Sequence, residues 1–388
     1  MNNKTIIFYG TPAHGHVNAS LYFIEQLTQT HKVIYYCSKE FESKIRAVGA
    51  EFRVYDIDLN ALSYGNQEVE FGNKPMISYR LCLYLNIFVL DTLLFEAKII
   101  GPDLIIYDSI ASWGKHVASI SKVKHIAFHS FVTVNRYLNP SFFAYFFAFI
   151  PKILRQIYLL PSVLPLKRKL RKKYGLKNLS FMDITLNKGK YNIFSFNRLL
   201  QPGGKSFNPT NLFIGPTTLK RRNDSIKDDL DYEEMNALIY ISLGTMVRDQ
   251  RILQKIMNTL KDTPYQFVIS TGISDIKGLT IPKNFILRSS VNQLEILKYA
   301  KVYVSTGGMN GLLESIEQNV PMIIYPTQGE KKINAKRIQK LGLGLYIKNL
   351  NHLKISIDKF FNQKLDKNLT EHLSQIDLTD ALKLIEEM

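Results

Sequence analysis

Two histidines in one short turn are the first residues of this chain whose type and spacing could do chemistry. The segment Gly10–Asn18 (GTPAHGHVN) follows an apolar stretch directly, and His14 and His16 stand on either side of Gly15. An imidazole titrates near neutral pH, so it can take a proton from a hydroxyl group there. A single surface histidine is usually inert, but a pair in a turn bent by glycine and proline favours a general base.

A carboxylate that could support this base ends another apolar stretch. Asp108 follows the strand-like run Asp103–Tyr107 (DLIIY). A carboxylate bonded to a histidine fixes its tautomer and stabilises the imidazolium that forms. Because the carboxyl ends of parallel strands share one edge of a sheet, we expect Asp108 near the histidine turn. The alternative is that Asp108 caps a helix beginning near Ser112.

A second segment with chemical potential is Ser305–Ala335 (STGGMNGLLESIEQNVPMIIYPTQGEKKINA). A Gly-Gly pair at the start of a helix leaves backbone N–H groups uncovered, and the helix dipole adds positive charge, so the turn predicts a phosphate site. Glu314 in the helix, and the pair Glu330 and Asn334 after the next strand, add polar groups at the same edge of the predicted sheet.

The elements that must position these residues alternate between strands and helices in both halves of the chain. The first half predicts strands at Thr5–Tyr9, Lys32–Tyr36, Glu51–Tyr55, Asp103–Tyr107 and His125–His129, and helices at His16–Gln29, Phe41–Val48, Ile77–Ile100 and Ser112–Ser121. After a polar linker, Thr217–Asn236, the second half predicts strands at Leu238–Ser242, Gln266–Ser270, Asn284–Arg288, Lys301–Ser305 and Pro321–Tyr325. This pattern indicates an α/β protein with two Rossmann-like domains facing across a cleft.

Composition narrows the class of protein further. The chain has 388 residues, enough for two domains, and a formal net charge of +17. Its two cysteines, Cys37 and Cys82, form neither a disulfide framework nor a metal-ligand pattern, and the N-terminus lacks the features of a signal peptide. We therefore expect a cytoplasmic protein.

The positive charge is concentrated in one segment. Eleven basic residues lie between 152 and 190 with a single acid, Asp183, and the aromatic run Phe142–Ile150 comes just before them. Two interpretations of this segment remain open. It could contact an anionic membrane surface, or it could be a solvated helix face beside a hydrophobic wall. No stretch reaches the length of a membrane span, and no motif for reading nucleic acid is present.

With these motifs in place, the chain resembles the family 1 GT-B glycosyltransferases, in particular the bacterial macrolide-type branch that uses UDP- or dTDP-sugars. The resemblance covers nearly the whole chain. It rests on GTPAHGHVN, Tyr107–Ser109 (YDS), Tyr240–Met246 (YISLGTM), Val291–Leu297 (VNQLEIL) and the 301–335 block. It implies an acceptor-binding domain at 1–216, to which a C-terminal helix at about 376–388 returns, and a donor-binding domain at 217–375.

The resemblance also implies roles for individual residues. His16 corresponds to the catalytic base and Asp108 to its supporting acid. The family's donor-binding positions fall on Gly244, Thr245, Val291, Gln293, Thr306, Gly307, Gly308, Asn310, Glu314, Glu330 and Lys331. Acceptor-binding positions are expected at His14, Phe142, Phe143 and Phe146. Neither a metal nor a cofactor is expected beyond the nucleotide-sugar co-substrate.

Five positions depart from the family pattern. Thr306 replaces a histidine that contacts phosphate, Lys331 replaces a glutamine, and Gly311 replaces a serine or threonine. Ala19 and Asn292 replace prolines. Loss of one well-placed donor to a leaving group typically costs about 3–4 kcal/mol of transition-state stabilisation, which Thr306 and Lys331 could partly restore. With a cation at 331, a deoxysugar donor is as plausible as glucose.

The favoured hypothesis is an inverting, metal-independent glycosyltransferase. It would move a sugar from a UDP- or dTDP-sugar to a hydroxyl of a hydrophobic acceptor such as a polyketide, polyene, lipid or terpenoid, because the segment 134–165 is rich in aromatic residues. The alternative is a catalytically impaired GT-B homologue that serves as an auxiliary or scaffold subunit of a partner glycosyltransferase. A sugar-nucleotide epimerase on the same plan is a third hypothesis, and nucleic acid is not an expected partner.

Overall fold

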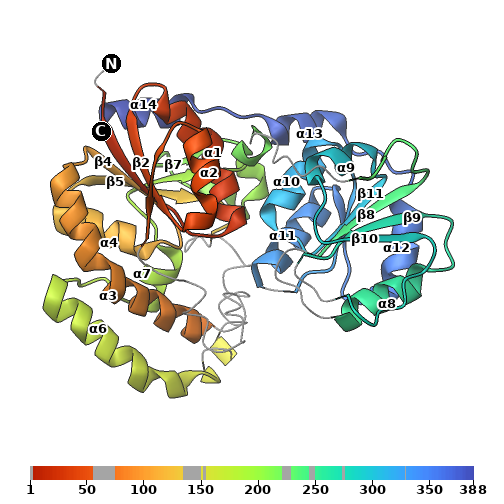
Figure 1. Ribbon diagram of the computed structural model, residues 1–388, viewed down its shortest axis with the longest axis horizontal. Helices are drawn as coiled ribbons and strands as arrows, with labels where there is room; N and C mark the ends of the chain where they lie inside the picture. Colours follow the sequence, from red (N-terminus) through yellow and green to blue (C-terminus); the bar gives the residue numbers. More distant parts are fainter. Residues whose placement is uncertain are drawn as a thin grey trace. The chain divides into compact units, whose positions relative to one another are not determined.

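The computed structural model describes residues 3–55, 75–133, 150–151, 154–220, 229–243, 250–272, 276–327 and 329–388 (Figure 1). The chain forms two compact units, which are described separately here. Unit 1 comprises Met1–Arg221 and Ile376–Met388, and unit 2 comprises Arg222–Gln375. The division after Arg221 lies close to the boundary predicted after residue 216.

The described part of unit 1 contains a parallel sheet with the strand order β3-β2-β1-β4-β5-β6-β7. Its strands are β1 (Thr5–Tyr9), β2 (Lys32–Cys37), β3 (Glu51–Val54), β4 (Leu104–Asp108), β5 (Lys124–His129), β6 (Tyr191–Phe194) and β7 (Asn211–Phe213). The strand order reverses at the neighbours β1 and β4. In open α/β sheets such a switch point leaves a crevice at the carboxyl ends of the strands. The histidine turn follows β1 and Asp108 ends β4, so both lie at this point.

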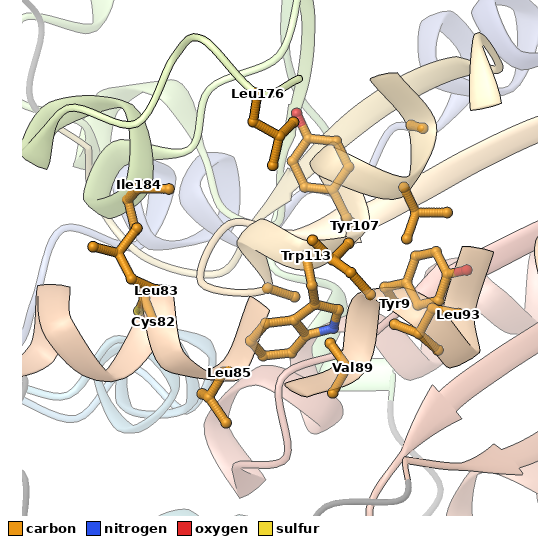
Figure 2. Packing of buried hydrophobic residues seen from close by; sticks show 14 of the residues in the cluster. Tyr9, Cys82, Leu83, Leu85, Val89, Leu93, Tyr107, Trp113, Leu176 and Ile184 are labelled. Atoms are coloured by element: carbon orange, nitrogen blue, oxygen red, sulfur yellow. The ribbon is translucent and has the colours of Figure 1, made fainter. Parts of the chain in front are cut away.

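Helices cover both faces of this sheet. The unit contains α1 (His14–Thr28), α2 (Glu42–Ala47), α3 (Pro75–Ile100), α4 (Ser112–Ser121), α6 (Leu160–Tyr174), α7 (Phe181–Leu186) and α14 (Thr379–Glu387), with short 3-10 turns η1 (Lys39–Phe41), η2 (Ile157–Leu159), η3 (Arg198–Leu200), η4 (Gly204–Ser206) and η5 (Thr217–Lys220). Because side chains alternate along a strand, one face packs on α3, α4, α6 and α7 and the other on α1, α2 and α14. Figure 2 shows Trp113 of α4 in the first of these cores, beside Val89 of α3 and Tyr9 of β1.

The C-terminal helix belongs to unit 1. Ala381 and Ile385 of α14 are fully buried in the core on the α1 face. The Lys4 Nζ donates to the carbonyl oxygen of Ile385 at 2.6 Å. The start of the predicted linker also belongs here, because Thr217 and Thr218 are fully buried and the Thr217 hydroxyl donates to the Ala19 carbonyl at 2.5 Å. The segment predicted as a polar linker therefore begins with two residues that are packed into unit 1.

Unit 2 is built on a second parallel sheet, with the order β10-β9-β8-β11-β12-β13 in its described residues. The strands are β8 (Leu238–Ser242), β9 (Gln266–Ser270), β10 (Phe285–Arg288), β11 (Val302–Ser305), β12 (Met322–Ile324) and β13 (Gly344–Tyr346). The helices are α8 (Gln250–Leu260), α9 (Gln293–Tyr299), α10 (Met309–Glu317), α11 (Gly329–Lys340), α12 (Leu353–Phe360) and α13 (Lys367–Ser374), with a 3-10 turn η6 (Leu350–His352). The order reverses at β8 and β11, so the Gly-Gly turn after β11 also follows a switch point.

Several predicted boundaries shift in the structure. Helix α1 begins at His14, so both histidines belong to its first turn and not to the turn before it. Within the described residues, the structure contains no helix with the length and apolar character needed to cross a bilayer.

Candidate active site

The candidate catalytic residues of unit 1 are a histidine and a buried carboxylate bonded to it. Asp108 is the last residue of β4 and His16 lies in the first turn of α1. The His16 Nδ1 is 2.8 Å from Asp108 Oδ2. The side chain of His16 is 17% exposed and that of Asp108 is 2% exposed. The imidazole therefore reaches the surface while its partner is shielded from water, an arrangement that suits a base and the acid that orients it.

The carboxylate of Asp108 is held in its ionised form. Its Oδ1 accepts hydrogen bonds from the Thr11 hydroxyl at 2.7 Å and the Ile110 backbone N–H at 2.9 Å. Burial raises the pKa of Asp108, but the charge of His16 and the hydrogen bonds outweigh it and leave the pKa below its usual value. An ionised carboxylate accepts only, so Nδ1 of His16 carries the proton and Nε2 keeps its lone pair.

The alternative role for Asp108, a cap on the next helix, is wrong. The N-cap residue of α4 is Ala111, which makes no side-chain capping bond. Asp108 lies three residues earlier and uses its oxygens on Thr11, Ile110 and His16. Its position at the strand end thus serves the histidine.

Sequence reasoning missed two polar residues beside this pair. The Ser130 Oγ lies 3.1 Å from His16 Nδ1, and Thr11 holds the carboxylate as described above. Ser130 comes directly after His129, the last residue of β5, and β5 is the neighbour of β4. The signal that could have found it is its place one residue beyond an adjacent parallel strand.

The predicted acceptor residues fall into two groups. His14 is exposed, and its ring packs edge-on against Phe41 with the ring centroids 5.0 Å apart. Phe142, Phe143 and Phe146 lie outside the described residues.

Unit 2 has its own group of candidate residues, at the corner between β11 and α10. Gly307 has φ +90°, and a Cβ there would lie 2.9 Å from Ile324 Cγ2 and 3.0 Å from the Lys331 carbonyl oxygen. Only glycine fits this backbone without strain. Gly308 is the N-cap of α10 without a side-chain capping bond, and open space surrounds its Cβ position. A helix start of this kind can hold a phosphate.

Two departures from the family pattern contact one another at this corner. The Lys331 Nζ donates to the Thr306 hydroxyl at 3.0 Å, and that hydroxyl donates to the Leu243 carbonyl at 3.2 Å. Gly244 and Thr245, which follow Leu243 and are predicted to bind the donor, lie outside the described residues. The structure therefore places a cation next to the position where the family has a histidine.

A chain of hydrogen bonds holds Glu314, one of the predicted donor-binding residues, in place. Glu314 in α10 is 1% exposed, and Gln293 at the start of α9 donates from Nε2 to its Oε2 at 2.5 Å. The Tyr240 hydroxyl donates to Gln293 Oε1 at 3.0 Å. Sequence reasoning missed Tyr240, although it lies in the YISLGTM motif. Val291, two residues before Gln293, is buried.

The remaining donor-binding candidates surround the same corner. The Asn334 Nδ2 donates to the Gly307 carbonyl at 2.9 Å and to Glu330 Oε1 at 3.3 Å. Glu330 lies in the first turn of α11 and Asn310 in the first turn of α10. Among the described residues, no group of three or more histidine, cysteine, aspartate or glutamate side chains is arranged to hold a metal ion.

Comparisons with known proteins identify the family of the chain. Residues 202–380 match the model of the family described as "UDP-glucoronosyl and UDP-glucosyl transferase". The chain is similar to NDP-glycosyltransferase YjiC of Bacillus subtilis, with 30% identity over 89% of this chain and 85% of the relative, and to NDP-glycosyltransferase YjiC of Bacillus licheniformis, with 28% identity over 89% and 86%. Among solved structures, the glycotransferase of kitacinnamycin superimposes with a TM-score of 0.79 at 20% identity, over 100% of this chain and 99% of the other.

The chain belongs to the UDP-glucuronosyl and UDP-glucosyl transferase family, that is, to the family 1 glycosyltransferases. Its two parallel-sheet units match the GT-B fold. The protein is an enzyme that transfers a sugar from a nucleotide-sugar donor.

Proposed function

We propose that the protein transfers a sugar, with inversion at the anomeric carbon, from a UDP- or dTDP-sugar to a hydroxyl of a hydrophobic acceptor. The observation that carries this proposal is the 2.8 Å hydrogen bond between His16 Nδ1 and Asp108 Oδ2. It leaves Nε2 of the same ring as the atom that takes the proton of the acceptor hydroxyl.

The reaction is a single displacement. The acceptor O–H gives its proton to His16 Nε2 while the acceptor oxygen forms a bond to the anomeric carbon. The bond from that carbon to the phosphate oxygen breaks, and the nucleoside diphosphate leaves with the electron pair. Asp108 stabilises the imidazolium that forms, because its carboxylate is ionised and 2.8 Å away. A positioned base of this kind contributes about 10²–10⁴-fold to the rate.

Unit 2 supplies the donor site in this proposal. The uncapped start of α10 after Gly308, with Asn310, Thr306 and the cation of Lys331, would hold the diphosphate and neutralise the charge that develops on it. Glu314 would accept the ribose hydroxyls. The remaining expected contacts are Val291 and Gln293 with the nucleobase, Gly244 and Thr245 with the diphosphate, and Glu330 with the sugar. No metal is needed in this scheme, because hydrogen bonds and the helix dipole stabilise the phosphate charge.

The acceptor is proposed to be apolar, for instance a polyketide, polyene, lipid or terpenoid. A solved structure of the same fold is described as the glycotransferase of kitacinnamycin, and this supports a natural-product acceptor. His14 and its partner Phe41 would border the acceptor beside His16. The aromatic residues Phe142, Phe143 and Phe146 remain predictions for the same role.

The test compares His16→Ala with the neighbouring control His14→Ala. Binding of UDP- and dTDP-sugars is measured by calorimetry, and transfer is measured with a panel of apolar hydroxyl compounds. We expect H16A to lose about 10²–10⁴-fold in kcat with unchanged donor affinity, and H14A to change mainly the KM for the acceptor. A fully active H16A enzyme would refute the proposed base. Donor binding by the wild type without transfer to any acceptor would instead favour an auxiliary role beside a partner glycosyltransferase.

A further inference from the structure

Helices α3 and α6 form an outer face of unit 1 that the proposed reaction does not use. The two helices lie side by side and run in the same direction (Figure 1). Arg80 of α3 donates to Ser162 of α6 at 3.5 Å, and eleven residues further along both helices Asp91 forms an ion pair with Lys173. We refer to the exposed side of α3 together with residues 154–177 as the α3–α6 face.

Large apolar side chains gather on the α3–α6 face. Of the fourteen large hydrophobic residues exposed in the described part of the chain, nine lie here, and each is at least 39% exposed. They are Tyr84, Phe88, Phe95 and Ile99 on α3 and Leu154, Ile157, Tyr158, Leu160 and Leu164 at the start of α6 and just before it. Single exposed apolar residues are normal, but a gathering of this kind marks an interaction surface.

The same face carries a dense positive charge. Helix α6 contains six lysines and arginines between Lys167 and Lys173 and no acidic residue. Lys173 is bonded to Asp91, whereas Arg168, Lys169, Arg171 and Lys172 are exposed. Cations near the end of a helix are favourable for the dipole. That effect is confined to the last turn and does not account for the apolar residues beside them.

The exposed apolar and cationic side chains lie along one side of α6. Leu164, Arg168 and Arg171 recur at intervals of three or four residues along α6, and Ile157 precedes them in η2. Val163 and Leu170 on the opposite side of α6 are buried in the core of unit 1. The exposed side is therefore apolar in its first half and cationic in its second half. Exposed apolar area and a cluster of cations are the two contributions that bind a helix to an anionic membrane surface.

The cations of the α3–α6 face indicate which kind of partner could cover it. A second copy of the chain would bring two clusters of cations toward each other, because α6 offers no acid in return. Nucleic acid would satisfy the cations but not the nine apolar residues. We propose that the α3–α6 face docks the protein on an anionic lipid bilayer, with the apolar half of α6 in the headgroup region and the cationic half on lipid phosphates.

This inference does not rest on the proposed acceptor or on His16. The test measures binding of the full chain to vesicles without donor or acceptor, by cosedimentation. Vesicles of phosphatidylcholine alone are compared with vesicles that also contain phosphatidylglycerol. We expect binding to the anionic vesicles only, weakened strongly by added salt.

Variants locate the binding on the chain. Each interfacial cation contributes about fivefold to binding, so R168Q/R171Q/K172Q should bind anionic vesicles about 100-fold more weakly. The matched control K261Q/K354Q/K364Q removes the same charge from exposed positions of unit 2 and should bind like the wild type. The double variant I157Q/L164Q tests the apolar half and should also bind more weakly. Sugar transfer in the absence of vesicles should be the same in the wild type, in R168Q/R171Q/K172Q and in the unit 2 control.

Three outcomes would overturn the inference. The first is a wild type that ignores anionic vesicles or binds neutral ones equally well. The second is equal loss in R168Q/R171Q/K172Q and in the unit 2 control, which would indicate attraction by net charge alone. The third is a concentration-dependent dimer that I157Q/L164Q dissociates without any vesicle binding, which would make this face a contact between copies of the chain. None of these results bears on whether His16 acts as the base.

Discussion

Replacing Asp108 by asparagine should exchange the donor and the acceptor in the hydrogen bond that orients His16. In the wild type, Oδ1 accepts from the Thr11 hydroxyl and from the Ile110 backbone N–H, and Oδ2 accepts from His16. A backbone N–H can only donate, so the amide oxygen of the substituted side chain must stay at the Oδ1 position. The amide NH₂ group then faces His16 Nδ1, where a second donor cannot be accommodated.

The imidazole can relieve this conflict only by moving its proton from Nδ1 to Nε2. The Ser130 hydroxyl, 3.1 Å from Nδ1, can donate to the freed lone pair and favours the same change. A His16 that is protonated on Nε2 cannot take the proton of an acceptor hydroxyl. The full contribution of the base is then lost, so we expect Asp108→Asn to lower kcat by about 10³-fold, which corresponds to about 4 kcal/mol.

The assay is a double-mutant cycle in single-turnover kinetics. D108N, H16A and the double variant are compared with the wild type, with donor affinity and thermal unfolding as controls for folding. Because Asp108 acts through His16, the double variant should be no slower than H16A. A D108N enzyme with nearly wild-type kcat, or a double variant whose losses add, would refute the reasoning.

Two further predictions concern the corner between β11 and α10, where the donor diphosphate is proposed to bind. Lys331→Gln removes the cation bonded to Thr306 and should lower kcat by about 10²-fold, whereas T306H/K331Q, which restores the family residues at both positions, should recover most of it. Unchanged single-turnover rates in K331Q would contradict this role. Gly307→Ala should destabilise unit 2 by about 1–3 kcal/mol because φ is +90° and Ile324 is too close. Gly308→Ala should leave the unfolding midpoint unchanged but weaken binding of UDP, and equal unfolding midpoints for both variants would count against the geometry.

Local patterns were sufficient to predict most of the strands in order, although β6 and β13 were missed. The strands β1, β4, β8 and β11 were predicted within one residue of their observed bounds, because each is a short apolar run between polar turns. The start of α1 was placed two residues late. Nothing in the sequence separates a histidine in the first helical turn from one just before it, since the first turn lacks the intrahelical bonds that would constrain composition.

Contacts between distant residues were harder to foresee. Ser130 reaches His16 across 114 positions of the sequence, and only the adjacency of β4 and β5 brings them together. The polar segment after Thr217 was predicted as linker because it lacks an apolar period. Its first threonines are nevertheless buried against α1, because the Thr217 hydroxyl is satisfied by the Ala19 carbonyl.

The departures from the family pattern can be understood as linked exchanges once the structure is known. In the sequence, Thr306 and Lys331 are two separate losses, 25 positions apart. In the structure, Lys331 donates to Thr306. The position that has a threonine in place of the family's phosphate-binding histidine therefore has a cation beside it. In the proposed reaction, Lys331 would therefore supply the kind of charge stabilisation that the family's histidine gives.

Gly311 shows the same relation to its surroundings. A Cβ at this position would lie 2.6 Å from the hydroxyl oxygen of Tyr303, whose ring stacks on Tyr240 at 5.3 Å. Tyr240 in turn donates to Gln293, which holds the predicted ribose ligand Glu314. A serine or threonine at 311 would displace this column of side chains. Glycine at 311 therefore fits the packing of Tyr303 against Tyr240.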